Sequence, residues 1–259
     1  MKTSGNTILI TGGGSGIGAA LAHRLAGAGN TVIVAGRRQS ALDEAIAGHE
    51  NMHALTLDIE DAAAIKAFAA EVIARFPALN AVVHNAGIMR FETVDAARDL
   101  SDAEATITTN LLGPIRLTDA LIDHLVAQPD AAIVTVTSGL AYVPLVATPT
   151  YSATKAAVHS YTVSLREALV GKVEVIEIAP PAVRTELTPG QSDREGYMPL
   201  DAFADEVIAL WSQSPTPPEI MVERVKPLRF AEREGAFDER LNMINDFARA
   251  EREKAGGAA

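Results

Sequence analysis

The stretch Thr7–Gly18, TILITGGGSGIG, decides the fold of this chain. A short apolar run leads directly into a glycine turn, and a helical pattern follows the turn. Such a tight turn excludes Cβ atoms where the backbone approaches a ligand, and the free N–H groups at a helix start attract phosphate. A turn that serves only strand–helix packing is the alternative. The position of the glycines between a strand and a helix favours a pyrophosphate site for a dinucleotide.

The spacing of the glycines narrows the kind of phosphate site. Gly12-x3-Gly16-x-Gly18 is looser than the commoner G-x-G-x-x-G spacing. No Gly-Lys-Ser or Gly-Lys-Thr follows it, which excludes a phosphate loop of the nucleotidase type.

Strand and helix patterns continue to alternate beyond this stretch. Most strands are continuous Val and Ile runs, which are typical of strands buried on both faces. The clearest helix has an apolar stripe from Ile65 to Phe76, with Asp61 near its start. Parallel neighbours need crossover helices, so the alternation predicts α/β architecture: a single doubly wound Rossmann-type domain with a parallel seven-stranded sheet and helices on both faces. The predicted strands are Thr7–Thr11, Thr31–Ala35, Met52–Asp58, Ala81–His84, Ala131–Thr137, Val173–Ala179 and Glu219–Val225.

The predicted domain spans residues 1–259, and two of its regions depart from the alternation. Residues 188–199, TPGQSDREGYMP, are polar and contain two glycines, which predicts a mobile loop. Residues 226–259 form an atypical, strongly charged helical extension. Its apolar face is typical of a surface helix or a helix that contacts another subunit.

Composition excludes several function classes. The chain has 259 residues, 33 acidic and 22 basic, with a formal charge of −11. Nucleic acid is not expected as a partner, because a phosphate backbone requires a basic surface. With no cysteine, disulfides, zinc–thiolate sites and thiol nucleophiles are excluded, and the six scattered histidines predict no metal site. No membrane segment is recognisable either, so we expect a cytoplasmic protein.

The end of the second strand bears on the choice of cofactor. A site for NAD usually has an acid there to hold the ribose 2′-hydroxyl. This chain has Gly36-Arg37-Arg38, and an arginine can pair with a 2′-phosphate through two hydrogen bonds. Two solvated arginines are the alternative. We therefore predict that NADP(H) is preferred over NAD(H).

Tyr151 and Lys155 predict the chemistry. Four residues apart on a helix, they share one face and can act on one reacting centre. A free phenol has a pKa of about 10, and an ammonium about 4 Å away would favour the phenolate by up to about 4 kcal/mol at an effective dielectric of about 20. Tyr151 would then donate a proton in reduction and accept one in oxidation. Ser138 ends a run of residues that strongly favour a β-strand, at the sheet edge where ligands bind, and could hold a substrate oxygen.

These features together resemble the classical short-chain dehydrogenase/reductase family, across roughly residues 5–212. The run from Ser138 to Leu187 also resembles the DltE-type oxidoreductases, which are named for teichoic-acid D-alanylation gene clusters. The matching segments are Thr11–Gly18, Asp58, Asn85-Ala86-Gly87, Asn110, Ser138, Tyr151 and Lys155.

The resemblance implies a catalytic tetrad of Asn110, Ser138, Tyr151 and Lys155. Asn110 would hold a water linked to Lys155, which would also hold the nicotinamide ribose. Ser138 would fix the substrate carbonyl, and Tyr151 would donate the proton as hydride arrives from nicotinamide C4. The implied cofactor-binding residues are Gly12, Gly14, Ser15, Gly16, Ile17, Gly18, Arg37, Arg38, Asp58, Ile59, Asn85, Ala86, Gly87, Tyr151, Lys155, Pro181, Val183 and Thr185.

Two departures from the family pattern concern the pocket. Pro180-Pro181 stands where the family usually has Pro-Gly, and proline lacks an N–H and fixes φ, which affects the backbone beside the nicotinamide. The usual C-terminal strand pattern is also missing, which affects the back wall of the substrate pocket and the usual tetramer contact. A homodimer or homotetramer is still expected, because the helices that carry Asn110 and Tyr151 form the subunit contact in the family.

The predicted substrate pocket is mostly apolar. It comprises Met89, Gly139, Tyr142 and Leu187, with residues 188–199 as the substrate-side loop. We therefore expect an NADPH-dependent reductase of ketones or aldehydes of moderate size, acting reversibly on a small molecule. The alternatives are an NAD-dependent secondary-alcohol dehydrogenase and a non-catalytic dinucleotide sensor on the same fold.

Overall fold

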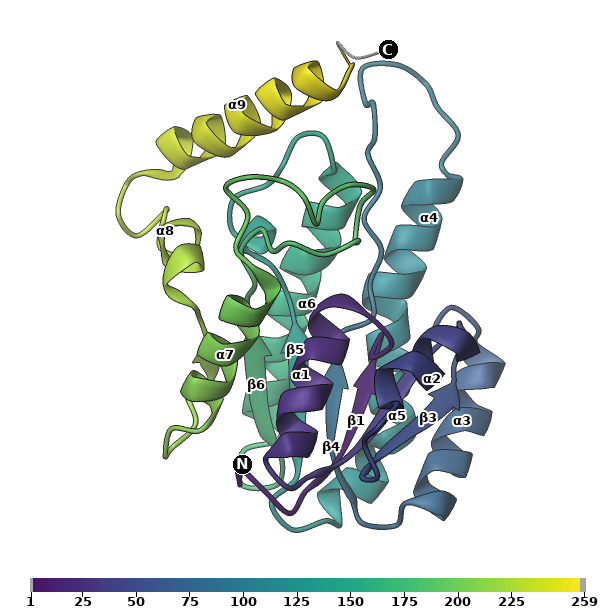
Figure 1. Ribbon diagram of the computed structural model, residues 1–259. Coiled ribbons are helices and arrows are strands. Elements are labelled where there is room, and N and C mark those ends of the chain that lie inside the picture. Colours follow the sequence, from purple (N-terminus) through teal and green to yellow (C-terminus); the bar gives the residue numbers. More distant parts are fainter. Residues whose placement is uncertain (1, 257–259) are drawn as a thin grey trace.

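A parallel sheet of seven strands forms the centre of the protein, as the computed structural model of residues 2–256 shows (Figure 1). The strand order is β3-β2-β1-β4-β5-β6-β7. Successive strands are therefore added on one side of β1 as far as β3 and on its other side from β4 onward. In such folds, ligands bind at the carboxyl ends of the two strands where this order switches, here β1 and β4. The strands are β1 Thr7–Thr11, β2 Thr31–Gly36, β3 Met52–Thr56, β4 Leu79–His84, β5 Ala132–Val136, β6 Glu174–Ile178 and β7 Glu219–Ile220.

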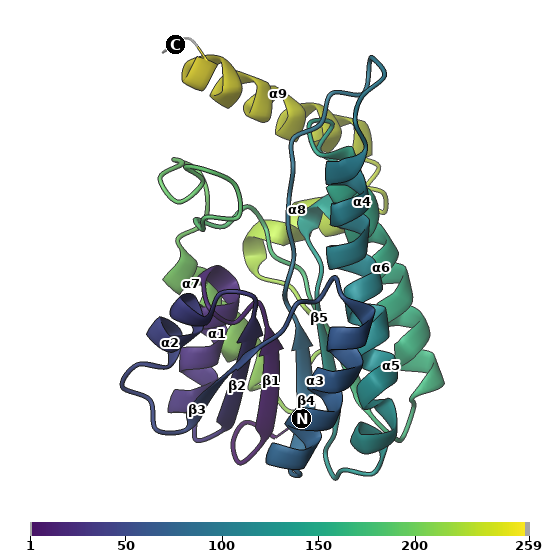
Figure 2. The same ribbon diagram turned by 90° about the vertical axis from the view of Figure 1, so that its right-hand side faces the viewer.

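Helices cover both faces of the sheet (Figure 2). The packing of α1, α2 and α7 forms one core layer, and the packing of α3, α5 and α6 forms the other. Successive strand residues alternate between these layers, so that Ile8 and Ile10 enter the first and Leu9 enters the second. The helices are α1 Gly16–Gly27, α2 Gln39–Ile46, α3 Ala62–Arg75, α5 Gly113–Val126, α6 Pro149–Ala168 and α7 Leu200–Trp211.

The predicted single Rossmann-type domain is confirmed, and the strand predictions agree closely except at the C-terminal edge. The predicted strand Glu219–Val225 is wrong beyond its second residue, because only Glu219 and Ile220 pair with β6. A 3₁₀ turn, η3 (Glu223–Val225), follows. Asp61 caps α3 as its sequence position suggested, accepting hydrogen bonds from the backbone N–H groups of Ala63 and Ala64.

The carboxyl edge of the sheet carries the irregular segments. A π-helical turn, η1 (Thr108–Leu112), joins α4 (Ser101–Ile107) to α5, and a 3₁₀ turn, η2 (Gly139–Ala141), follows β5. Residues 188–199 are a loop, as predicted. The C-terminal extension forms the short helix α8 (Lys226–Arg229) and the long helix α9 (Phe237–Gly256), which crosses above that loop in both ribbon views (Figures 1 and 2). No helix within the described residues is long and apolar enough to cross a membrane.

Candidate active site

The glycine turn is packed against the end of β4. A Cβ atom at Gly12, whose φ is +66°, would lie 2.9 Å from Ala86 Cα, and one at Gly18 would overlap the carbonyl oxygen of Gly12. Asn85 Nδ2 donates to the carbonyl oxygens of Thr11 (3.0 Å) and Gly12 (3.2 Å). Asn85 therefore fixes the turn that opens α1, and only glycine fits at positions 12 and 18, where the turn packs against Asn85 and Ala86.

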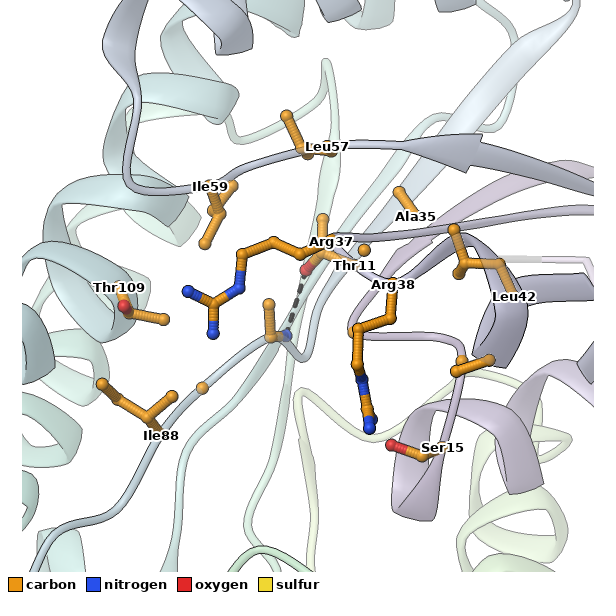
Figure 3. Close-up of a pocket in the computed structure, with 16 residues that line it drawn as sticks. Thr11, Ser15, Ala35, Arg37, Arg38, Leu42, Leu57, Ile59, Ile88 and Thr109 are labelled. Atoms are coloured by element: carbon orange, nitrogen blue, oxygen red, sulfur yellow. Dashed lines mark hydrogen bonds between the residues drawn. The ribbon is translucent and has the colours of Figure 1, made fainter.

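A pocket opens directly beside this turn (Figure 3). Arg37 reaches across it toward Thr109 and Ile88, whereas Arg38 is turned toward Ser15. Among the 16 residues that line the pocket, two are basic and none is acidic. The lining residues are Thr11, Gly12, Gly14, Ser15, Ala35, Gly36, Arg37, Arg38, Ala41, Leu42, Leu57, Ile59, Ala86, Gly87, Ile88 and Thr109.

The Arg37 side chain is already engaged in an ion pair. Its Nη1 lies 3.1 Å from Glu60 Oε1, and the same carboxylate oxygen accepts a hydrogen bond from Thr109 Oγ1 (2.8 Å). The two predicted adenine residues have different surroundings. Ile59 lines the pocket, whereas exposed Asp58 lines an adjoining hollow that shares Arg37 with the pocket, and it accepts the backbone N–H of Glu60 at 3.0 Å. Glu60 is thus a pocket-edge residue that the motif analysis did not single out.

Asn110 and Lys155 meet beside Gly87. A Cβ at Gly87 would lie 3.2 Å from Asn110 Oδ1 and 3.7 Å from Lys155 Nζ. Asn110 makes two hydrogen bonds to the backbone of Ile88: its Oδ1 accepts the N–H at 2.8 Å, and its Nδ2 donates to the carbonyl oxygen at 2.9 Å. Lys155 Nζ donates to Val136 O (2.8 Å). Both side chains are buried and hydrogen-bonded, so their polar atoms are held in fixed directions next to this pocket.

Tyr151 and Ser138 complete the group. Both are buried, and a hydrogen bond joins their side chains. Lys155 Nζ lies 5.5 Å from the centre of the Tyr151 ring. Ser138 also caps η2 by accepting the backbone N–H of Leu140 (3.1 Å). All four predicted catalytic side chains therefore belong to one end of the sheet, carried by η1, the end of β5 and α6.

Burial governs the acid–base state of this group. It raises the pKa of Tyr151 to about 12, although the hydrogen bond with Ser138 acts in the opposite direction. Burial also lowers the pKa of Lys155, to about 8. The lowering of the Tyr151 pKa that was expected from Lys155 does not appear here, because desolvation of Tyr151 dominates the shift. At neutral pH, Tyr151 carries its proton and most Lys155 side chains are charged.

The segment after β6 is organised around Gln191, which the sequence did not indicate. Gln191 Nε2 donates to the carbonyl oxygen of Val183 (2.9 Å) and to Thr185 Oγ1 (3.2 Å). Thr185 in turn faces the glycine turn, because a Cβ at Gly16 would lie 3.5 Å from its Cβ. Gln191 is buried in a polar loop, and no motif or spacing marks it.

The four predicted substrate-pocket residues have different surroundings. Met89 and Leu187 are half-buried on segments next to the predicted cofactor residues. Gly139 packs against α8, since a Cβ there would lie 2.8 Å from Leu228 Cδ1, and its N–H donates to Pro180 O (2.8 Å), just before Pro181. The hydroxyl of Tyr142 donates to Glu177 at 2.8 Å, so it is used inside the fold and is not available to a substrate.

The described residues contain no group of three or more His, Cys, Asp or Glu that could hold a metal ion. His84, which precedes Asn85, is buried, and burial lowers its pKa to about 4. Its Nε2 lies 2.9 Å from Thr118 Oγ1. This histidine is a neutral core residue that links β4 to α5.

Comparison with known proteins agrees with this geometry. The model of the short chain dehydrogenase family matches residues 6–196. The chain is 40% identical over 249 residues to the uncharacterized oxidoreductase DltE of Bacillus subtilis (strain 168), covering 95% of this chain and 98% of the relative. It is 34% identical over 186 residues to a sulfoacetaldehyde reductase of Chromohalobacter salexigens, covering 70% of this chain and 74% of the relative.

A solved structure has the same fold over nearly the whole chain. It is a short chain dehydrogenase from Burkholderia cenocepacia J2315 in complex with NADP, with a TM-score of 0.79 at 24% identity. The alignment covers 95% of this chain and 99% of that one. The family model and the relatives show that this chain belongs to the short chain dehydrogenase family and is an oxidoreductase of carbonyl and alcohol groups, similar to the DltE-type members.

Proposed function

We propose that the protein is an NADPH-dependent reductase that converts a ketone or an aldehyde of moderate size to an alcohol, reversibly. The observation that carries the proposal is the meeting of Asn110 and Lys155 at Gly87, with the hydrogen-bonded pair Tyr151 and Ser138 on the same edge of the sheet. The group adjoins, through Gly87, the pocket beside the glycine turn.

The residues of the pocket fit a dinucleotide. The part of the glycine turn that lines the pocket, Gly12 to Ser15, would receive the pyrophosphate at the start of α1, and Leu57 and Ile59 would flank the adenine. When bound, the cofactor supplies the hydride. Lys155 would hold the nicotinamide ribose, and the segment Val183–Thr185, braced by Gln191, would hold the carboxamide.

The protein's own residues manage the proton. Tyr151 is protonated at neutral pH, which is the state that reduction requires of a proton donor. Ser138 would hold the substrate carbonyl oxygen beside the phenol. The ammonium of Lys155 would stabilise the phenolate that forms, and Asn110 would hold the water through which Tyr151 is reprotonated.

The preference for NADPH rests on Arg37 and Arg38. A 2′-phosphate carries more negative charge than a hydroxyl, and the pocket offers two guanidinium groups and no carboxylate among its lining residues. The sulfoacetaldehyde reductase among the relatives is named for reducing an aldehyde, which supports the same reaction class here. Cytoplasmic location and homo-oligomeric assembly stay predictions.

The test follows the absorbance decay of NADPH and NADH with a panel of aryl ketones, diketones and aldehydes. Tyr151→Phe is assayed beside the wild type. Turnover with NADPH that disappears in the variant, while NADPH still binds, supports the proposal. Turnover that survives the substitution contradicts the proton-donor role. NADH turnover at least tenfold better than NADPH would overturn the cofactor assignment in favour of an NAD-dependent dehydrogenase, and tight NADPH binding without turnover would favour a sensor.

A further inference from the structure

Glu177 is a buried carboxylate next to the active site. It lies on β6 with an exposed fraction of 0%, between two apolar neighbours. Among residues 2–251, whose burial is described, no other acidic residue is fully shielded from solvent. An isolated buried charge is costly, and it persists only where partners compensate the lost hydration.

Three side chains provide that compensation. Thr137 Oγ1 and the Tyr142 hydroxyl donate to Glu177 Oε1, at 2.7 and 2.8 Å. His159 Nδ1 lies 2.8 Å from Oε2 and 3.0 Å from Oε1. The carboxylate therefore accepts hydrogen bonds from three separate segments: the end of β5, the residue after η2, and α6.

Each of these partners is close in sequence to a reacting residue. Thr137 directly precedes Ser138, and Tyr142 follows η2, the turn that Ser138 caps. His159 lies on α6, one helical turn beyond Lys155 and two turns beyond Tyr151. Glu177 thus ties together the segment that carries Ser138 and the helix that carries Tyr151 and Lys155.

An ion pair from the C-terminal part of the chain packs against this network. Arg229 of α8 pairs with Glu219 of β7, at 2.8 Å from Nε to Oε2 and 3.0 Å from Nη2 to Oε1. The Arg229 guanidinium also lies 4.8 Å from the centre of the Tyr142 ring. The charged and titratable groups that face Glu177 from neighbouring elements are therefore His159, Tyr142, Arg229 and Glu219.

We infer that Glu177, with His159 and Tyr142, is a positioning network that fixes Ser138 relative to Tyr151 for proton transfer. None of the three acts on the substrate in this role. The inference rests on the proposed function, because it assigns the network to the same reaction. A rigid link of this kind matters, since proton donor and carbonyl-holding hydroxyl must meet the same oxygen atom within a few tenths of an ångström.

The titration of the network gives the inference a pH signature. The hydrogen bond to Glu177 raises the pKa of His159, against the effect of burial. Burial alone would raise the pKa of Glu177, but hydrogen bonds from His159, Thr137 and Tyr142 bring it below its usual value. The stabilisation from His159 is complete below about pH 6.5 and is lost as pH rises through its raised pKa. The stabilisation from Glu177 is lost as pH falls through the lowered pKa of its carboxyl group.

Two variants and one control test the inference. Glu177→Gln keeps the shape and removes the charge, and Tyr142→Phe removes one donor. Thr162→Val is the control: it removes the buried Thr135–Thr162 hydrogen bond (2.8 Å), which also links β5 to α6 but lies a turn further from the reacting residues. We expect Glu177→Gln to lower kcat at least tenfold, with the NADPH Kd changed less than twofold. Tyr142→Phe should have a smaller effect in the same direction, and Thr162→Val should leave kcat within twofold.

Two readouts do not depend on turnover. In an NMR titration, the pKa of the His159 ring should lie above 6.5 in the wild type and fall in Glu177→Gln. Hydrogen exchange in a peptide covering residues 138–148 should accelerate in Glu177→Gln but not in Thr162→Val. If exchange accelerates in Glu177→Gln but the wild type turns over no substrate, the proposed reaction is contradicted and the positioning role is not. Unchanged exchange, or equal kcat in Glu177→Gln and Thr162→Val, would overturn the positioning role. If Glu177→Gln does not fold, Tyr142→Phe against Thr162→Val decides the question by the same two measurements.

Discussion

Lys155 carries a charge that its surroundings penalise. The side chain is buried, and burial lowers its pKa to about 8. The proposed reduction requires the ammonium, because it would stabilise the phenolate left on Tyr151. We therefore expect kcat/KM for reduction to fall as pH rises through about 8. A pH series from 6 to 10 measures this limb. Lys155→Arg, which stays charged across the series, should show no such fall in whatever activity it retains, and a wild-type profile flat to pH 10 would refute the assignment.

In the proposed function, Glu60 would compete with the 2′-phosphate of the cofactor for Arg37. The ion pair at 3.1 Å occupies the guanidinium that the 2′-phosphate is expected to use. Partly exposed ion pairs contribute up to about 1 kcal/mol, which corresponds to about fivefold in affinity. Glu60→Gln should therefore tighten NADPH binding two- to fivefold in a fluorescence titration and leave NADH binding unchanged.

The matched control for Glu60 is Glu71→Gln. It breaks the comparable exposed pair Glu71–Arg75 (2.8 Å) on α3, away from the pocket lining, and should change neither affinity. Weaker NADPH binding in Glu60→Gln would mean that the carboxylate holds Arg37 in its binding position.

At the scale of single residues, motif positions were predictable and supporting residues were not. Ser138, Tyr151 and Lys155 follow from local spacing and the end of a strand, which sequence expresses directly. Glu177 has a signal in the sequence, because it is an acid within a Val and Ile run, but no motif includes it. Gln191 left none, because its role arises only when residues 183–185 fold back against it.

At the scale of elements, the strands were predictable because burial on both faces requires continuous apolar runs. The exception is β7, whose length depends on its partner strand. Its sequence is strand-like to Val225, but its partner β6 ends at Ile178, and Pro180-Pro181 follows without N–H donors. Pairing stops where the partner stops, and the sequence of β7 alone does not contain that limit.

Helix α9 was predicted as a charged helix, but its attachment is a tertiary feature. Asn245 Oδ1 accepts the backbone N–H of Val146 (2.8 Å), and its Nδ2 donates to Pro144 O (3.2 Å). The ring of Phe247 lies 6.2 Å from that of Tyr197 in the loop 188–199. The helix therefore connects the segment after η2 to the substrate-side loop.

Asn245→Ala should loosen this connection. Loss of a buried side chain that makes three hydrogen bonds costs roughly 1–3 kcal/mol locally. We expect KM for the carbonyl substrate to rise severalfold, with the NADPH Kd unchanged. Asn242→Ala, at an exposed position of the same helix, is the control. Equal KM values in the two variants would show that α9 does not shape the substrate side.

At the scale of the whole molecule, exposed apolar residues on two neighbouring helices bear on assembly. Two helices near the predicted subunit contact present apolar side chains to solvent: Ile107 at the end of α4 is 40% exposed, and Val163 on α6 is 46% exposed. These two helices also pack against each other, so the residues belong to one pair of elements. Exposed apolar residues on neighbouring helices favour burial in a symmetric contact.

We therefore expect a native mass of two or four times 27.3 kDa by light scattering after gel filtration. The contact should resist salt, because apolar burial does not weaken with ionic strength as ion pairs do, and this matters for a chain with a charge of −11. Val163→Glu would place a charge in the contact and should shift the mass toward the monomer. Val94→Glu, at a 55% exposed position in the loop before α4, should not. A wild-type mass of one chain would refute the expectation, and a Val163→Glu mass equal to the wild type would locate the contact elsewhere.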